Sequence, residues 1–327
     1  MIISKTPFRI SFVGGGSDLA AYYEQFGGAV LSTSINKYMY ISSHRFFEED
    51  KIRTKYSITE TVDNVDALKH PILKEALKLT GIKGGIEISS IADVPSGTGM
   101  GSSSSFTVGV LHNLYAYTNQ FVSKEQLAQQ ACAIEIEKLG EPIGKQDQYA
   151  AAYGGLNIIE FHKDGRVSVL PIHLSKDNSQ ELESDLLMFY VGNQRKASDI
   201  LTEQKKNTQQ ADKAKILQEM VSLVYELRNS LYAGNLENFG SLMHQNWLLK
   251  KALASGISNP MIDDIYSAGM KAGALGGKLL GAGGGGFMLF YCPKERQAKL
   301  RSELHSLKEF KFSFDKDGSK IIYYDHD

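Results

Sequence analysis

Hydrophobic and polar positions alternate with two different periods in the first half of this chain. Phe8, Ile10 and Phe12 are separated by polar or small residues, which predicts a strand. Similar patterns predict strands over residues 38–43 and 85–91, and a hairpin over 156–161 and 167–172. Helical periodicity predicts helices over residues 72–79, 102–117 and 125–139, the last one capped by Ser123. The first half therefore mixes strands and helices.

The second half begins with an almost wholly apolar run at residues 186–191, as expected of a buried strand. Four helical segments follow, up to about residue 272, and a stripe of large apolar residues runs along one of them at spacings of three and four. This stripe is expected to face a core rather than a dimer seam; it consists of Leu217, Met220, Val224, Leu227 and Leu231. Strands are predicted at 286–291, 310–314 and 320–324, with a helix over 293–304. The irregular order favours an α+β fold over a doubly wound α/β fold.

Length and composition bound the class of protein. A chain of 327 residues is expected to form two domains, and a polar stretch at residues 174–183 places the boundary, giving domains 1–175 and 176–327. A net charge of −1 argues against a nucleic-acid or membrane-surface partner. The two cysteines show no metal-binding spacing, and no signal or transmembrane segment is apparent. A cytoplasmic protein is expected, with a homodimer left open.

In the segment from Pro95 to Ser105, three alternating glycines are followed by four consecutive serines, at which the predicted helix 102–117 begins. Glycine permits turns with positive φ, in which consecutive backbone N–H groups converge, and a helix N-terminus adds positive charge. The segment therefore predicts a phosphate site, although a simple capped loop is the alternative. A Walker A motif is absent, because no Lys-Ser or Lys-Thr pair follows at the required spacing.

Two further glycine clusters attract attention. Gly14, Gly15 and Gly16, followed by Ser17 and Asp18, exceed what a turn between strands needs and suggest a substrate loop. The run 281–286 satisfies Gly-x-Gly-x-x-Gly but is followed by a strand pattern, whereas a dinucleotide site requires a helix there.

Two carboxylates are candidates for chemistry. Asp147 stands beside Lys145 and Gln146 and could orient or deprotonate an alcohol, although an isolated Asp near a helix start is commonly a dipole partner. Glu135 could join a serine hydroxyl and phosphate oxygens around Mg²⁺, although a solvated helix face is the simpler reading.

Taken together, the motifs resemble the GHMP kinase superfamily, which includes galactokinase, homoserine kinase and mevalonate kinase. Three signatures occur in the family's order: Arg9 to Asp18, Pro95 to Ser103, and the glycines 281–286. The resemblance implies a two-domain fold, with a ribosomal protein S5 domain 2-like N-terminal domain and a ferredoxin-like C-terminal domain.

The resemblance also implies roles for particular residues, with ATP and Mg²⁺ as cofactors. Asp147 would be the catalytic aspartate, Arg9 would polarise the acceptor hydroxyl, and Ser103 with Glu135 would hold Mg²⁺. The ATP phosphates would be bound by Pro95, Gly97, Gly99, Met100, Gly101, Ser102, Ser103 and Ser104. The acceptor would be bound by Gly14, Gly15, Gly16, Ser17, Asp18, Gly283 and Gly284.

Within the superfamily, the motif blocks are most similar to bacterial D-glycero-D-manno-heptose 7-phosphate kinases, which phosphorylate the anomeric O1. A phosphorylated sugar requires cations, for which Arg195 and Lys196 are the first candidates, with Lys37 and Lys278 behind them. An ordinary solvated charge pair at 195–196 is the alternative. A fucokinase-like or other sugar kinase, a mevalonate-pathway kinase, and a non-enzymatic sugar sensor stay open as other functions.

Overall fold

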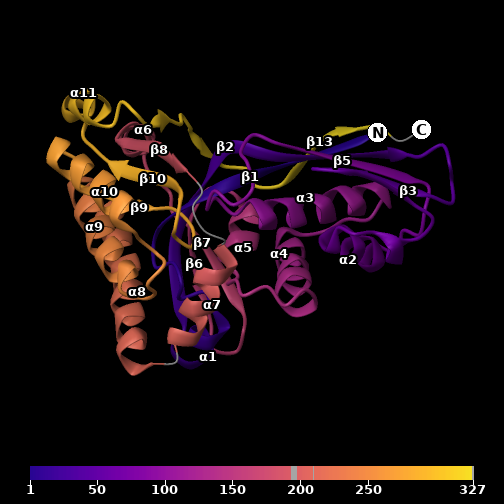
Figure 1. The fold of residues 1–327 in the computed structure, drawn as a ribbon, viewed down its shortest axis with the longest axis horizontal. Coiled ribbons are helices and arrows are strands. Elements are labelled where there is room, and N and C mark those ends of the chain that lie inside the picture. The colour runs from indigo at the N-terminus through magenta and orange to yellow at the C-terminus, as the bar shows by residue number, and fades with distance from the viewer. Residues whose placement is uncertain (193–196, 209, 326–327) are drawn as a thin grey trace.

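The computed structural model describes residues 1–192, 197–208 and 210–325, which form two antiparallel-rich sheets covered by helices (Figure 1). The mixed architecture confirms the predicted α+β fold class. No helix in the described ranges combines the length and the apolar character needed to cross a lipid bilayer.

The larger sheet has nine strands, six of which follow the order β13-β1-β2-β5-β3-β4. β12 and β6 also pair with β2, and β7 pairs with β6. The bounds are β1 (Ile2–Val13), β2 (Gly28–Arg45), β3 (Ile52–Lys55), β4 (Thr59–Val62), β5 (Ile86–Ala92), β6 (Leu156–Phe161), β7 (Val167–Pro171), β12 (Phe314–Asp315) and β13 (Lys320–Tyr324).

The helices of the first half of the chain pack with the larger sheet. They are α1 (Ala20–Phe26), α2 (Pro71–Thr80), α3 (Ser102–Tyr117), α4 (Lys124–Cys132) and α5 (Gln146–Tyr153), with a 3₁₀ turn at Val65–Ala67. The Ser123 side chain accepts a hydrogen bond from the Gln126 amide, which confirms the predicted N-cap. The predicted helix 125–139 instead changes at residue 133 into a π-helical segment, Ala133–Lys138, which carries Glu135. Such wide turns are frequent at functional sites.

From Pro7 onward, β1 is buried along its whole length rather than on one face. Two hydroxyl groups join it to α3, because Ser4 donates to the Gly109 carbonyl and Ser105 donates to the Pro7 carbonyl. From the second half, Phe239 packs edge-on against Phe12 with ring centroids 5.0 Å apart. β1 therefore forms part of the contact between the two halves of the chain, and its C-terminal end delivers the first glycine loop into that contact.

The smaller sheet has four antiparallel strands in the order β11-β8-β10-β9. With its helices it follows the βαββαβ plan of a ferredoxin-like domain, as expected. The strands are β8 (Leu186–Gly192), β9 (Gly276–Leu279), β10 (Gly286–Tyr291) and β11 (Lys308–Glu309). The helices are α6 (Lys176–Ser184), α7 (Ala197–Asn207), α8 (Ala211–Tyr232), α9 (Glu237–Lys251), α10 (Pro260–Ala272) and α11 (Lys294–Glu303).

The apolar stripe on α8 is buried, which confirms it as core. Its first two members, Leu217 and Met220, belong to the apolar cluster of the smaller sheet. The remaining three, Val224, Leu227 and Leu231, belong to the cluster of the larger sheet. α8 thus connects the two cores.

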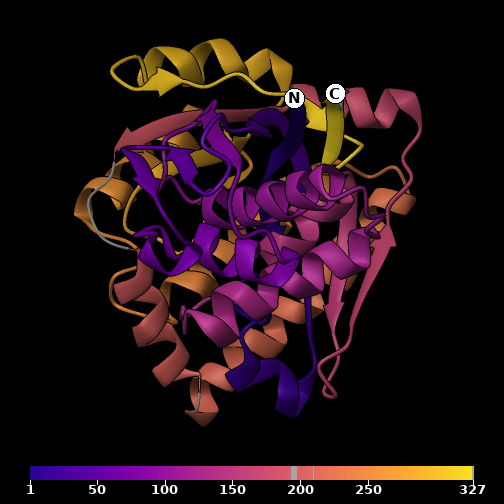
Figure 2. The same cartoon turned by 90° about the vertical axis from the view of Figure 1, so that its right-hand side faces the viewer.

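The end of the chain returns to the larger sheet, where β13 pairs with β1 and β12 pairs with β2. Both views show this last strand beside the N-terminal residues of β1 (Figures 1 and 2). The predicted boundary at 175/176 lies between the last hairpin of the larger sheet and the first strand of the smaller one. It stays a prediction, and two strands from beyond it, β12 and β13, belong to the larger sheet.

The predicted strand over residues 310–314 is wrong for most of its length. Residues 310–313 form the crossing from β11 in the smaller sheet to β12 in the larger one. Phe310 packs against Phe287, with ring centroids 5.0 Å apart, and the Ser313 amide donates to the Asn36 side chain. The alternation of aromatic residues therefore reflects packing along a crossover and not a strand.

Candidate active site

The loop between β5 and α3 has the backbone of a phosphate cradle. Gly97, Gly99 and Gly101 have φ values of +75°, +81° and +73°, which are strained for residues with side chains. α3 begins at Ser102, so the first-turn amides of this helix, which have no intrahelical acceptors, lie directly after the glycines. The Ser105 hydroxyl donates to the Pro7 carbonyl, which fixes the helix start against β1.

The third glycine run supports this loop through backbone contact. A Cβ on Gly99 would lie 2.4 Å from the Leu280 carbonyl oxygen, and one on Gly281 would lie 2.4 Å from the Gly99 Cα. A Cβ on Gly286 would lie 2.4 Å from the Thr98 carbonyl oxygen. Both loops therefore require glycine so that two backbones can touch.

Arg9 and Asp147 meet beside the cradle. The Arg9 guanidinium donates two hydrogen bonds to the Asp147 carboxylate, at 2.7 and 2.8 Å, and a third at 2.6 Å to the Gly99 carbonyl. Arg9 is only 4 % exposed, so this paired fork is held rigidly. A Cβ on Gly101 would lie 3.1 Å from an Asp147 oxygen, which places the carboxylate against the last glycine of the loop.

Glu135 and Ser103 also meet, as the sequence motifs imply. The Ser103 hydroxyl donates to the Glu135 carboxylate at 2.6 Å, and the Gln148 amide donates to its other oxygen at 2.7 Å. Burial raises the pKa of Glu135, with Asp147 acting in the same direction, while the hydrogen bonds from Ser103 and Gln148 oppose the rise.

This pair fits the protein's share of a Mg²⁺ site. Mg²⁺ takes one or two carboxylates and completes its shell with phosphate oxygens and water. No group of three or more His, Cys, Asp or Glu side chains that could hold a metal is present among the described residues. Ser103 and Glu135 would therefore hold the ion together with the phosphates of a nucleotide.

The first glycine loop turns directly beneath these groups. A Cβ on Gly14 would lie 2.1 Å from the Ala29 carbonyl oxygen, and the Gly14 amide donates to the Asn246 side chain on α9. Ser17 is wholly buried and its hydroxyl lies within hydrogen-bond distance of the Gly14 and Ala29 carbonyls. Ser17 therefore stabilises the loop and does not face the cavity.

Asp18 is 3 % exposed and accepts hydrogen bonds from the Gly16 amide at 2.9 Å and the Gln146 amide at 3.3 Å. Burial raises its pKa, and the negative charge of Asp147 adds to the rise. Two carboxylates from different elements thus face one small region, and Arg9 compensates directly for only one of them.

A cavity of about 70 Å³ joins these groups. It is lined by four residues predicted from the sequence, Arg9, Asp147, Asp18 and Gly16, and by Gln204 and Lys250, which the sequence analysis missed. Lys250 lies on α9 at the end of a buried series that includes Phe239, Met243 and Asn246. A lysine on the buried face of a helix is the signal that could have identified it.

The remaining predicted acceptor residues lie elsewhere. A Cβ on Gly283 would lie 2.6 Å from the Ile257 Cα, and the Gly284 amide donates to the Ile257 carbonyl, so these glycines pack against the 257 segment. Gly281 and Ala282 line the cavity in their place. Arg195 and Lys196 fall outside the described residues.

The two reserve lysines have other contacts. The buried Lys278 ammonium donates to the Ser11 carbonyl at 2.7 Å, and the Lys37 ammonium lies 5.1 Å from the Phe310 ring centroid. Lys278 therefore links β9 to β1 within the core.

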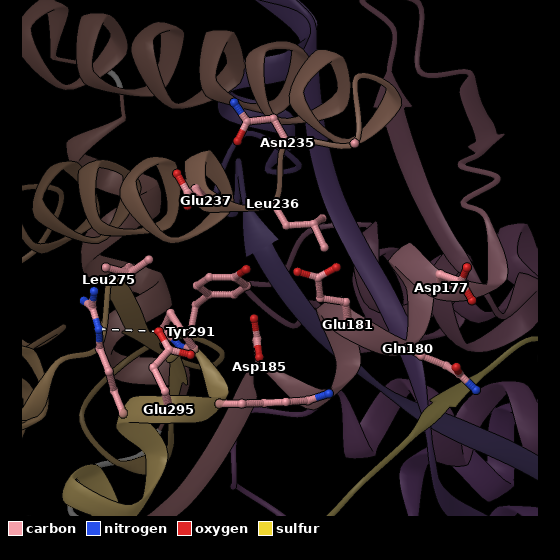
Figure 3. Close-up of a pocket in the computed structure, with 14 residues that line it drawn as sticks. Asp177, Gln180, Glu181, Asp185, Asn235, Leu236, Glu237, Leu275, Tyr291 and Glu295 are labelled. Atoms are coloured by element: carbon pink, nitrogen blue, oxygen red, sulfur yellow. Dashed lines mark ion pairs between the residues drawn. The ribbon is translucent and has the colours of Figure 1, made fainter.

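A larger cavity of about 800 Å³ lies among α6, the α8–α9 connection and the start of α11, and shares no lining residue with the first (Figure 3). Five carboxylates line it: Asp177, Glu181, Asp185, Glu237 and Glu295. Lys294 and Arg296 also line it, so carboxylates outnumber cations by five to two and the cavity disfavours phosphate groups. The larger cavity is therefore not the nucleotide site, and its size does not identify the active site.

Comparison with known proteins agrees with this geometry. Residues 66–155 match the GHMP kinases N terminal domain, and residues 224–308 match the GHMP kinases C terminal domain, together more than half of the chain. The chain belongs to the GHMP kinase family.

This GHMP kinase is 28 % identical to D-glycero-alpha-D-manno-heptose 7-phosphate kinase from Campylobacter jejuni, over 98 % of both chains. It is also 28 % identical to the bifunctional fucokinase/GDP-fucose pyrophosphorylase of Arabidopsis thaliana, matching 93 % of this chain but only 31 % of that protein. The crystal structure of a D-glycero-D-manno-heptose 1-phosphate kinase from Bacteroides thetaiotaomicron superimposes over all of both chains, with a TM-score of 0.82 and 23 % identity. The last likeness concerns the fold.

Proposed function

We propose that this GHMP kinase transfers the γ-phosphoryl group of ATP to the anomeric O1 of D-glycero-D-manno-heptose 7-phosphate. The product is the 1,7-bisphosphate, a precursor for nucleotide-activated heptose and surface glycans. The observation that carries the proposal is the Arg9–Asp147 pair, which lies between the glycine-rich cradle and a polar cavity. The full-length similarity to a heptose 7-phosphate kinase supports the choice of acceptor.

The donor would lie along the 95–104 loop. Backbone amides after the positive-φ glycines would bind the phosphate oxygens, and α3 would direct its positive end toward them. Ser103 and Glu135 would hold Mg²⁺, which neutralises charge on the transferring group when bound.

The transfer would be a direct in-line displacement. The acceptor oxygen forms a bond to the γ-phosphorus as the bond to the ADP oxygen breaks, and the hydroxyl proton passes to the Asp147 carboxylate. Arg9 positions that carboxylate through two hydrogen bonds and places positive charge beside the developing oxyanion.

The polar groups that line the cavity support a polyhydroxylated acceptor. Asp18 offers carboxylate oxygens, Lys250 offers N–H donors, and Gln204 offers both kinds of group. A sugar hydroxyl both donates and accepts, so a ring with several hydroxyls can satisfy this mixed set. Arg195 and Lys196 stay the proposed partners of the acceptor phosphate.

The decisive experiment is a phosphoryl-transfer assay over a panel of acceptors, with NMR of the product to locate the new phosphate. The panel contains D-glycero-D-manno-heptose 7-phosphate, unphosphorylated heptose, L-fucose, galactose and mevalonate. We expect the highest kcat/KM with the heptose phosphate and phosphate on O1. A preference for L-fucose would assign the chain to the fucokinase alternative. ATP consumption that no acceptor stimulates would support a sensor and contradict the proposal.

A further inference from the structure

The acceptor cavity contains a buried cation that takes no part in the phosphoryl-transfer step itself. Lys250 projects from α9 and is only 5 % exposed. Its ammonium makes no hydrogen bond and no ion pair with any residue in the described ranges, whereas its neighbour Lys251 pairs with Asp263 at 3.0 Å. An unpartnered charge in the interior is costly, and folded proteins seldom retain one without a function.

The Lys250 ammonium lies close to the groups that are proposed to react. It lines the same cavity as Arg9, Asp147 and Asp18. A Cβ on Gly15 would lie 3.5 Å from the Lys250 Nζ, so the ammonium lies directly over the middle glycine of the first loop. This spacing is ordinary van der Waals contact, so Lys250 lies against the first glycine loop.

Gln204 presents a second set of unsatisfied groups in the cavity. It projects from α7 and is 1 % exposed, and among the described residues neither its amide nitrogen nor its carbonyl oxygen has a hydrogen-bond partner. Its nitrogen lies 2.2 Å from the place that a Cβ on Gly16 would occupy. The side-chain oxygen of Gln146, which lines the same cavity, also has no hydrogen-bond partner in the part of the chain that the structure describes.

Buried polar groups in folded proteins are nearly always satisfied, and each exception has a specific cause. Here the exceptions come from three helices, α5, α7 and α9, and converge on one cavity beside the catalytic pair. A ligand that carries several hydroxyl groups would satisfy them together. An apolar ligand would leave them all unpaired.

We propose that Lys250, together with Gln204, binds hydroxyl oxygens of the sugar acceptor and determines acceptor specificity. This inference rests on the proposed sugar kinase activity and adds residues that the family motifs do not contain. Lys250 donates to one acceptor oxygen, and Gln204 donates to and accepts from a neighbouring hydroxyl. Because both residues belong to the second half of the chain, acceptor recognition is divided between the two halves.

The proposal predicts a selective loss in Lys250→Met, which keeps an unbranched side chain one atom shorter than lysine and removes the charge. The KM for the sugar acceptor is expected to rise at least about tenfold, the scale of a hydrogen bond to a charged group. The KM for ATP is expected to stay within about twofold, because the cradle is unchanged. The melting temperature is not expected to fall, since an unpaired buried charge has been removed.

Lys251→Met is the matched control, because it alters the adjacent residue on the same helix outside the cavity. Gln204→Leu provides a second test and should raise the acceptor KM without lowering the melting temperature. An unchanged acceptor KM in Lys250→Met would overturn the inference. A fall in melting temperature with parallel losses for both substrates would also overturn it, because that pattern indicates a structural role.

Monodeoxy analogues of the acceptor identify the hydroxyl that Lys250 binds. One analogue is expected to bind the wild type at least about tenfold more weakly than the parent sugar, and to bind Lys250→Met no more weakly than the parent does. Equal discrimination by both proteins would contradict the contact. The wild-type acceptor panel separates the two proposals: turnover with sugars but no Lys250 effect refutes only this inference, whereas no turnover with any sugar refutes both.

Discussion

At the scale of single residues, Asp147 is the proposed acceptor of the hydroxyl proton in phosphoryl transfer. Asp147→Asn retains the shape of the side chain but cannot accept a proton and carries no charge for Arg9. We expect kcat to fall by about 10²-fold or more, the scale of a lost general base, while the Kd for ATP changes little. Steady-state kinetics with nucleotide titration would measure both quantities.

Asp164→Asn is a suitable control, because Asp164 pairs with Arg166 at an exposed hairpin tip. Its kcat is expected to equal that of the wild type. Near-normal kcat in Asp147→Asn would remove Asp147 from the catalytic role and leave Arg9 as the principal charged group at the acceptor.

Lys250 makes stability depend on pH in an unusual direction. Burial lowers the pKa of its ammonium from 10.5 to about 8, although the carboxylates of Asp18 and Asp147 oppose this and Arg9 adds to it. The folded protein therefore binds this proton less strongly than the unfolded chain does. The destabilisation is complete below about pH 8 and disappears as the pH rises toward 10.5.

At pH 7 the free energy of unfolding of Lys250→Met should consequently exceed that of the wild type by about 3 kcal/mol. The variant should therefore unfold at a higher temperature. The difference should shrink progressively between about pH 8 and 10. Thermal unfolding of both proteins across pH 6 to 10 measures it. A difference that is constant over this range would show that the Lys250 ammonium is not destabilised by burial.

The sequence revealed the residues that belong to contiguous motifs. Arg9, Ser103, Glu135 and Asp147 stand in recognisable contexts, and the structure brings them together as two hydrogen-bonded pairs. Lys250 was missed because its neighbours in space are distant in sequence, and a lysine followed by Lys251 reads as an ordinary polar helix end. Only its place on the buried face of α9 distinguishes it.

At the scale of elements, the first glycine loop contains one glycine that the backbone geometry requires, Gly14, and one that lies beside the acceptor cavity, Gly15. Gly14 has a φ of +87°, and a Cβ there would meet the Ala29 carbonyl at 2.1 Å. Gly14→Ala should therefore destabilise the fold by at least about 2 kcal/mol, through backbone strain and steric overlap. Chemical denaturation of the two proteins measures the difference.

Gly15→Ala is the informative partner of this variant, because the nearest atom to a Cβ at Gly15 is the Lys250 ammonium, at the ordinary contact distance of 3.5 Å. It should unfold close to the wild type yet raise the KM for the acceptor, since the new methyl group occupies the space beside Lys250. Equal destabilisation by both substitutions would show that the triple glycine serves the backbone alone.

Elements were predicted well where one periodicity extended over several turns, as in α3, whose bounds match the expected residues 102–117. They were predicted poorly where tertiary contacts choose the conformation. The sequence of segment 133–138 has ordinary helical periodicity, yet the segment is π-helical and its Glu135 accepts hydrogen bonds from Ser103 and Gln148. Residues 310–313 have strand periodicity but connect two sheets. The local pattern of hydrophobic residues predicts neither the π-helix nor the crossover between sheets.

At the scale of the whole molecule, β13 closes the edge of the larger sheet along β1 and is paired with it at four positions. Removing residues 320–327 exposes that edge. Each paired position contributes roughly 1 kcal/mol to stability, and a loss of about 1 kcal/mol lowers the melting temperature by about 2 °C. The melting temperature should therefore fall by about 5 °C or more. Differential scanning calorimetry would measure the change.

Removal of residues 326–327 alone retains β13 and should leave the melting temperature unchanged. An equal melting temperature for the protein lacking residues 320–327 would show that β1 does not need its partner. Because Arg9 lies on β1, a protein lacking β13 is also expected to lose kcat in proportion to its unfolded fraction.

The pairing of β1 with β13 has a consequence for synthesis of the protein. β1 is synthesised before β13, so this edge of β1 stays unpaired until the residues between the two strands have been made. Contacts between such distant residues slow folding and prolong the exposure of unpaired strands. The interval between synthesis of β1 and synthesis of β13 is therefore a period in which this protein is prone to aggregate, and in which a chaperone would be useful to it.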